Sequence, residues 1–129
     1  MAFVVLVVDD SMLIRHTVCR FLEERGFVVE SATNGEDALE TLRRIRPHLI
    51  VTDMQMPRMG GGELIAALKT MPHTTDIPVV ILASRQSGLS ETVSHTVIYK
   101  DIDIEEQLGK AIQSVFGEVM NARASGAGN

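Results

Sequence analysis

Residues 3–11 read FVVLVVDDS, an apolar run that changes abruptly into two carboxylates and a serine. The run is rich in β-branched residues and apolar throughout, whereas a strand with one face in water would alternate apolar and polar positions. A strand of this kind is typical of a parallel sheet covered by helices on both faces. Ser11 is a good N-cap, so we expect a helix to begin directly after Asp9 and Asp10.

Four further short runs have a similar composition and are bounded by polar or turn-forming residues. Each is too short for a helix and is rich in Val, Ile or Tyr. They predict strands at Phe27–Ser31, Leu49–Thr52, Val79–Leu82 and Thr96–Tyr99.

Between these runs, apolar residues recur with the period of an α-helix. The first predicted helix has Ile14, Val18 and Leu22 on one face and ends at Gly26. Asp103 with Glu106 forms the capping-box pattern of the last helix. The other helices are predicted to run from Asn34 to Pro47 and over Glu63–Lys69, and the last helix is expected to end near Met120.

The alternation of strands and helices predicts an α/β fold: a doubly wound, five-stranded parallel sheet of the flavodoxin-like type with helices on both faces. The stretch from Ser84 to His95 is polar or helix-breaking, so the fourth helix of this fold is expected to be short or absent. Residues 121–129 contain Ala, Gly, Ser, Asn and one Arg, which predicts a disordered tail after a single domain over residues 1–120.

Composition excludes several classes of protein. The chain has 129 residues, a formal net charge of −5 and one cysteine, so neither a disulfide scaffold nor a nucleic-acid-binding surface is expected. The four histidines lie far apart and do not form a zinc-binding pattern. No apolar run reaches the ~18 residues of a membrane span, and no signal segment is evident. A cytoplasmic protein is expected.

Charged residues follow three of the predicted strands: Asp9 and Asp10 after the first, Asp53 after the third and Lys100 after the fifth. In such sheets, ligands bind at the carboxyl ends of the strands. Three carboxylates at one place repel one another unless a cation lies among them, and oxygen ligands favour Mg²⁺. Lys100 would supply a fixed positive charge for a phosphoryl oxygen.

Taken singly, these acids have a simpler interpretation. Asp9 and Asp10 fit helix caps, and Asp53 fits a turn ahead of Pro57. The combination of three acids with Lys100 favours the cation and phosphoryl site.

The segments around these residues resemble the receiver domain of two-component response regulators. The resemblance rests on the strand that ends in Asp9 and Asp10, on IVTDMQMPRMG at 50–60, on IPVVIL at 77–82 and on Lys100. It covers Val4 to about Phe116, nearly all of the chain that we expect to be ordered.

The resemblance implies a role for each matching residue. Asp53 is expected to accept a phosphoryl group from a sensor histidine kinase or a phosphotransfer protein. Mg²⁺ would be held by Asp10, Asp53 and the backbone carbonyl of Gln55, with Asp9 helping through a bound water, and Lys100 would bind the phosphoryl group. Such a domain is not an enzyme in the turnover sense, although it assists its own phosphorylation and dephosphorylation.

The sequence departs from the family pattern in the second half. Ala83 stands where a Thr or Ser is usual, and Ser84 can replace that hydroxyl if the backbone turns there. Val97 takes the place of the switch aromatic, with Tyr99 displaced, and Asp101 replaces the usual Pro. Two hypotheses therefore stay open: a phosphorylation switch, or a pseudo-receiver that acts as an interaction module without phosphorylation.

Output is expected through protein contact or through competition for phosphoryl groups, because no DNA-binding region follows the last helix. The expected contact surface is the side of the fourth strand and the last helix, in a monomer or weak dimer. Asp101-Ile-Asp103 faintly resembles the DxD motif of haloacid-dehalogenase-like phosphatases, but a helix cap explains Asp103 better.

Overall fold

The computed structural model describes residues 3–84, 96–101 and 103–127, with side chains described as far as Phe116. Five parallel strands form one sheet in the order β2-β1-β3-β4-β5. All five predicted strands are confirmed, each to within one residue at either end. They are β1 (Val4–Val8), β2 (Val28–Ala32), β3 (Leu49–Asp53), β4 (Val79–Ala83) and β5 (Thr96–Tyr99).

The helices begin at the capping residues that the sequence supplies. Ser11 Oγ accepts the Ile14 N–H at 3.3 Å, and Asn34 Oδ1 accepts the Asp37 N–H at 2.9 Å. Asp103 Oδ1 accepts the Glu106 N–H at 3.2 Å. The four helices in the described part of the chain are α1 (Met12–Glu24), α2 (Gly35–Thr41), α3 (Gly61–Thr70) and α4 (Ile104–Ala127).

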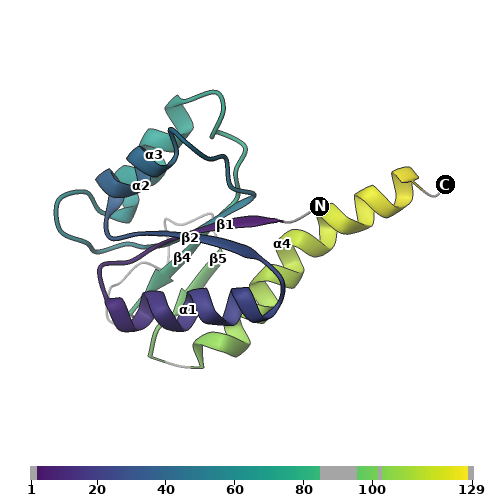
Figure 1. Cartoon of the computed structure of the whole chain (residues 1–129), viewed down its shortest axis with the longest axis horizontal. Coiled ribbons are helices and arrows are strands. Elements are labelled where there is room, and N and C mark those ends of the chain that lie inside the picture. Colours follow the sequence, from purple (N-terminus) through teal and green to yellow (C-terminus); the bar gives the residue numbers. More distant parts are fainter. Residues whose placement is uncertain (1–2, 85–95, 102, 128–129) are drawn as a thin grey trace.

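Helices cover both faces of the sheet, as the uniformly apolar strands predicted. Alternate residues of β1 point to opposite faces, so Val5 and Val7 join the core under α1 and α4. Leu6 and Val8 join the second core, under α2 and α3. Figure 1 shows the two layers on opposite sides of the sheet, with the end of α4 projecting beyond it. This is the doubly wound, flavodoxin-like fold.

Three helix boundaries differ from the sequence prediction. The helix α2 ends at Thr41 rather than near Pro47, because Arg43 and Arg44 donate to carbonyls three residues back and tighten the chain into turns. The helix α3 begins at Gly61, two residues before Glu63.

The helix α4 ends at Ala127 rather than near Met120. Its extension contains no proline, so every residue keeps the backbone N–H that a continued helix requires. The predicted loop between β4 and β5 lies outside the described residues over 85–95. In the part of the chain that is described, no helix has the length and apolar character needed to cross a membrane.

Candidate functional site

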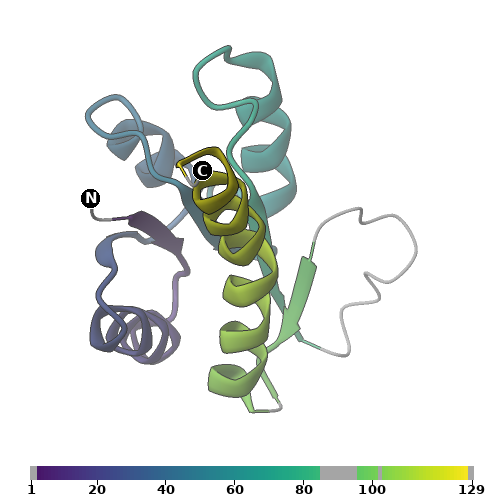
Figure 2. The same cartoon turned by 90° about the vertical axis from the view of Figure 1, so that its right-hand side faces the viewer.

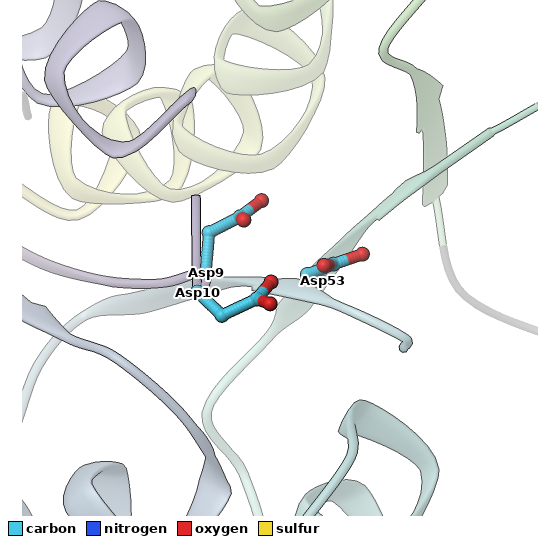
Figure 3. Close-up of side chains that lie close together, drawn as sticks. All are labelled: Asp9, Asp10 and Asp53. Atoms are coloured by element: carbon cyan, nitrogen blue, oxygen red, sulfur yellow. The ribbon is translucent and has the colours of Figure 1, made fainter. Parts of the chain in front are cut away.

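The carboxyl ends of the central strands bring three aspartates together. β1 and β3 are adjacent and pair Val8 with Thr52, so the residues that follow, Asp9 and Asp53, lie side by side. Asp10 follows on the same strand end. Each of the three carboxyl groups offers an oxygen within 4.8 Å of the other two. Figure 3 shows this cluster.

Lys100 joins the two buried carboxylates. Its Nζ lies 3.1 Å from Asp9 Oδ2 and 3.0 Å from Asp53 Oδ2. The N–H of Lys100 donates to the Ala83 carbonyl on β4 at 2.9 Å, which fixes the backbone at the end of β5. The ammonium group therefore offsets part of the free-energy cost of burying two negatively charged carboxylates.

Burial and the charges of their neighbours shift the pKa values of Asp53 and Lys100. Burial raises the pKa of Asp53 above its ordinary value; the Lys100 hydrogen bond and charge oppose this shift, and the Asp9 charge adds to it. Burial alone would lower the pKa of Lys100, but its interactions with the Asp53 and Asp9 carboxylates outweigh burial and raise it. Lys100 therefore stays charged at neutral pH.

Asp9 has an oxygen with no hydrogen bond. The residue is fully buried, and its Oδ1 accepts the Ser11 N–H at 2.8 Å. Among the described residues, no hydrogen bond to its Oδ2 is found, and its contact there is the ion pair with Lys100 Nζ at 3.1 Å. A buried carboxylate oxygen in this state costs free energy unless further positive charge lies near it. Together with Asp10 and Asp53, it forms an oxygen donor set that suits a hard divalent cation.

An open pocket of about 230 Å³ lies over the cluster. Ser84 follows directly after β4 and is exposed on the wall of this pocket. Gln55 is exposed on the wall as well. The residues lining the pocket are Asp10, Asp53, Met54, Gln55, Ala83, Ser84 and Lys100.

The loop that carries Gln55 is fastened to the start of α2. Gly35 donates its N–H to the Met59 carbonyl at 2.8 Å, and Arg58 Nε lies 3.0 Å from Glu36 Oε1. A Cβ at Gly35 would come within 2.5 Å of Met59 Cγ. Sequence reasoning missed these residues, because Asn34-Gly35 fits a helix cap without any partner in a later loop.

The structure thus brings together Asp9, Asp10, Asp53 and Lys100, as the strand ends predicted. Val97 lies apart from them: it is partly buried against the core under α2 and α3.

The family model of the response regulator receiver domain matches residues 5–114. Response regulator MprA of Mycobacterium leprae is 38% identical over 90 residues, which are 70% of this chain and 38% of that protein. A protein-glutamate methylesterase/protein-glutamine glutaminase of Clostridium acetobutylicum is 38% identical over 92 residues, 69% of this chain and 26% of that protein. The chain therefore spans well under half the length of these relatives.

Solved structures agree with the sequence relatives. The chemotaxis response regulator CheY4 of Vibrio cholerae superimposes with a TM-score of 0.80 at 30% identity, covering 89% of this chain and 99% of that one. Fold, family model and sequence relatives point to the same family. The chain belongs to the response regulator receiver domains of two-component systems.

Proposed function

We propose that this receiver domain accepts a phosphoryl group on Asp53 in a Mg²⁺-dependent reaction and signals by protein contact. The observation that carries the proposal is the placement of the Asp53 carboxylate in an open pocket, 3.0 Å from Lys100 and within 4.8 Å of two further acids. The donor is a phosphohistidine of a sensor kinase or of a phosphotransfer protein.

The reaction is a simple group transfer. An Asp53 carboxylate oxygen attacks phosphorus, a P–O bond forms and the P–N bond to the donor histidine breaks. The electron pair returns to the imidazole nitrogen, which takes up a proton. A carboxylate is a weak nucleophile, so the rate depends on positioning and on neutralising phosphoryl charge. Lys100 binds a phosphoryl oxygen as negative charge develops there.

Receiver domains bind Mg²⁺ at an acidic pocket, and the residues of this chain fit such an ion. The buried Asp9 oxygen without a hydrogen bond and the convergent carboxylates of Asp10 and Asp53 form an all-oxygen donor set. Asp10, Asp53 and the Gln55 carbonyl would hold the ion, and Asp9 would assist through a water. When bound, Mg²⁺ supplies positive charge to the phosphoryl oxygens.

Ser84 completes the proposed site. Its place on the pocket wall next to Ala83 lets its hydroxyl serve where the family usually has a Thr or Ser one residue earlier. A hydroxyl there donates to a phosphoryl oxygen and links the modified Asp53 to the end of β4.

The test is an intact-mass measurement on the purified chain. Incubation with a small phosphoryl donor is expected to add one phosphoryl group in the presence of Mg²⁺ and none with EDTA. Asp53→Asn should take up none, whereas Asp76→Asn, at an exposed acid outside the cluster, should behave like the wild type. A folded wild-type protein that gains no mass would contradict the proposal and favour an interaction module that works without phosphorylation.

A further inference from the structure

A side chain closes the sheet edge next to Lys100. β5 is the last strand in the sheet order, so within the described part of the chain one of its sides has no neighbouring strand. In a parallel ladder, the backbone polar groups of successive residues point alternately to the two sides. Since the Lys100 N–H bonds to Ala83 on β4, the N–H and C=O of Tyr99 face the open side.

The side-chain amide of Gln107, in the first turns of α4, occupies this open side. Its Oε1 accepts the Tyr99 N–H at 3.0 Å, and its Nε2 donates to the Tyr99 carbonyl at 2.8 Å. A primary amide offers a donor and an acceptor as a peptide group does, so it supplies both bonds that another strand would make with Tyr99. The same Nε2 donates to the Asp103 carbonyl at 3.2 Å.

These bonds tie the end of β5 to the start of α4. Only residues 100–103 connect the two elements, and none of them is proline. Figure 2 shows the start of α4 close to the end of β5. Among the described residues, Gln107 is the α4 residue whose side chain hydrogen-bonds to β5. It is half-buried, which limits competition from water.

We propose that Gln107 is a positioning residue for Lys100; the proposal rests on the phosphoryl-binding role given to Lys100 above. Tyr99 directly precedes Lys100, so a fixed Tyr99 peptide backbone fixes the point from which the lysine side chain extends. From there the ammonium group must hold contacts of 3.1 and 3.0 Å to Asp9 and Asp53. A misplacement of about 1 Å at a reacting group can lower a rate about 100-fold.

The first test compares Gln107→Leu with Gln113→Leu, an exposed glutamine on the same helix. Leucine keeps the approximate volume but cannot pair with Tyr99. We expect hydrogen exchange of the Tyr99 amide to speed up about tenfold or more in Gln107→Leu, as for the loss of a backbone hydrogen bond, with no change in Gln113→Leu. Unchanged Tyr99 exchange in Gln107→Leu would overturn the proposal.

The second test separates positioning from general stability. The rate constant of phosphorylation by a small donor should fall roughly 10- to 100-fold in Gln107→Leu. In a Lys100→Met background, Gln107→Leu should cause no further loss, because the group that it positions is gone. An unchanged rate in the single variant, or an equal loss in both backgrounds, would contradict the positioning role. Should Gln107→Leu fail to fold, Gln107→Glu replaces it in this rate measurement, because it keeps the acceptor for the Tyr99 N–H but loses the donor to the Tyr99 carbonyl.

Failure of the proposed function is recognisable separately. If the wild type takes up no phosphoryl group, the same double-mutant cycle is measured in urea unfolding, where it reports the ion pairs of Lys100. A coupling between Gln107 and Lys100 then supports the positioning role, and additivity of the two substitutions overturns it.

Discussion

The neighbours of the Asp53 carboxylate shift its pKa in opposite directions. Burial and the Asp9 charge disfavour its ionised form, whereas Lys100 favours it, and the net result is a raised pKa. The ionised form of Asp53 is therefore less favoured in the folded protein than in the unfolded chain. A cation bound beside Asp53 would favour its ionised form again.

Asp53→Asn is therefore expected to stabilise the metal-free protein at neutral pH. An acid with a raised pKa binds more protons in the folded state, so its contribution to stability falls as pH rises from its ordinary value of 3.8 through the folded-state value. The difference in unfolding free energy between Asp53→Asn and the wild type should grow over this pH range and then level off. Urea unfolding at a series of pH values in EDTA measures it. Equal stability of the two proteins at all pH values would contradict the electrostatic account.

Ser84→Ala tests the proposed hydroxyl at the pocket wall. A hydrogen bond to a charged group contributes roughly 1.5–3 kcal/mol, so phosphorylation by a small donor should slow about tenfold or more. Ser114→Ala, at an exposed position of α4, is the matched control and should leave the rate unchanged. A wild-type rate in Ser84→Ala would remove this serine from the site.

At the scale of the elements, the loop from Met54 to Gly60 is in contact with the start of α2. Arg58 has φ of 70°, in the left-handed region that a side chain disfavours, and its exposed side chain lies 3.0 Å from Glu36 on α2. The Gly35 N–H bond to Met59 fastens the same loop at the next residue. The start of α2 thus supports the loop that carries Gln55.

Gly35→Ala should disturb the metal site without touching a metal ligand. The added Cβ would clash with the side chain and carbonyl of Met59, which is expected to cost about 1–3 kcal/mol of stability and to weaken Mg²⁺ binding. Gly62→Ala is the control: its Cβ would meet only Met54 Cε, at 3.6 Å, and alanine favours the helix. Calorimetric titration with Mg²⁺ and urea unfolding of both variants check this. Equal Mg²⁺ affinity in the two variants would show that this loop does not affect Mg²⁺ binding.

At the scale of the whole molecule, Mg²⁺ binding is expected to raise the free energy of unfolding. A ligand that binds only the folded state at 100 times its dissociation constant adds about 2.7 kcal/mol to the free energy of unfolding. Mg²⁺ should therefore raise the thermal midpoint of the wild type, and Asp10→Asn should reduce the rise. Asp101→Asn, an exposed acid outside the three-carboxylate cluster, should retain it. The same rise in Asp10→Asn as in Asp101→Asn would show that Mg²⁺ acts elsewhere.

Much of this architecture could be predicted because it depends on local patterns. The run FVVLVVDDS identified a strand buried on both faces, and the rule for strand ends in parallel sheets placed Asp9, Asp10, Asp53 and Lys100 at one edge. Ser11, Asn34 and Asp103 cap their helices through contacts three residues away, which a sequence shows directly.

The remainder depends on contacts between distant segments. The end of α2 could not be predicted, since Leu42 and Ile45 continue the helical period whether the chain forms a helix or turns there. Gln107 has the appearance of an ordinary polar helix residue until Tyr99 lies beside it. Gly35 likewise acquires its role only when Met59 approaches from the loop after β3.

Locating the phosphoryl group within the chain tests the central claim most directly. The protein is phosphorylated by a small donor in Mg²⁺, digested in the cold at acid pH, and its peptides are sequenced by tandem mass spectrometry. We predict a single phosphoryl group, carried by Asp53 within the segment that follows Leu49. A phosphoryl group on Asp9, Asp10 or a histidine, with Asp53 unmodified, would contradict the account.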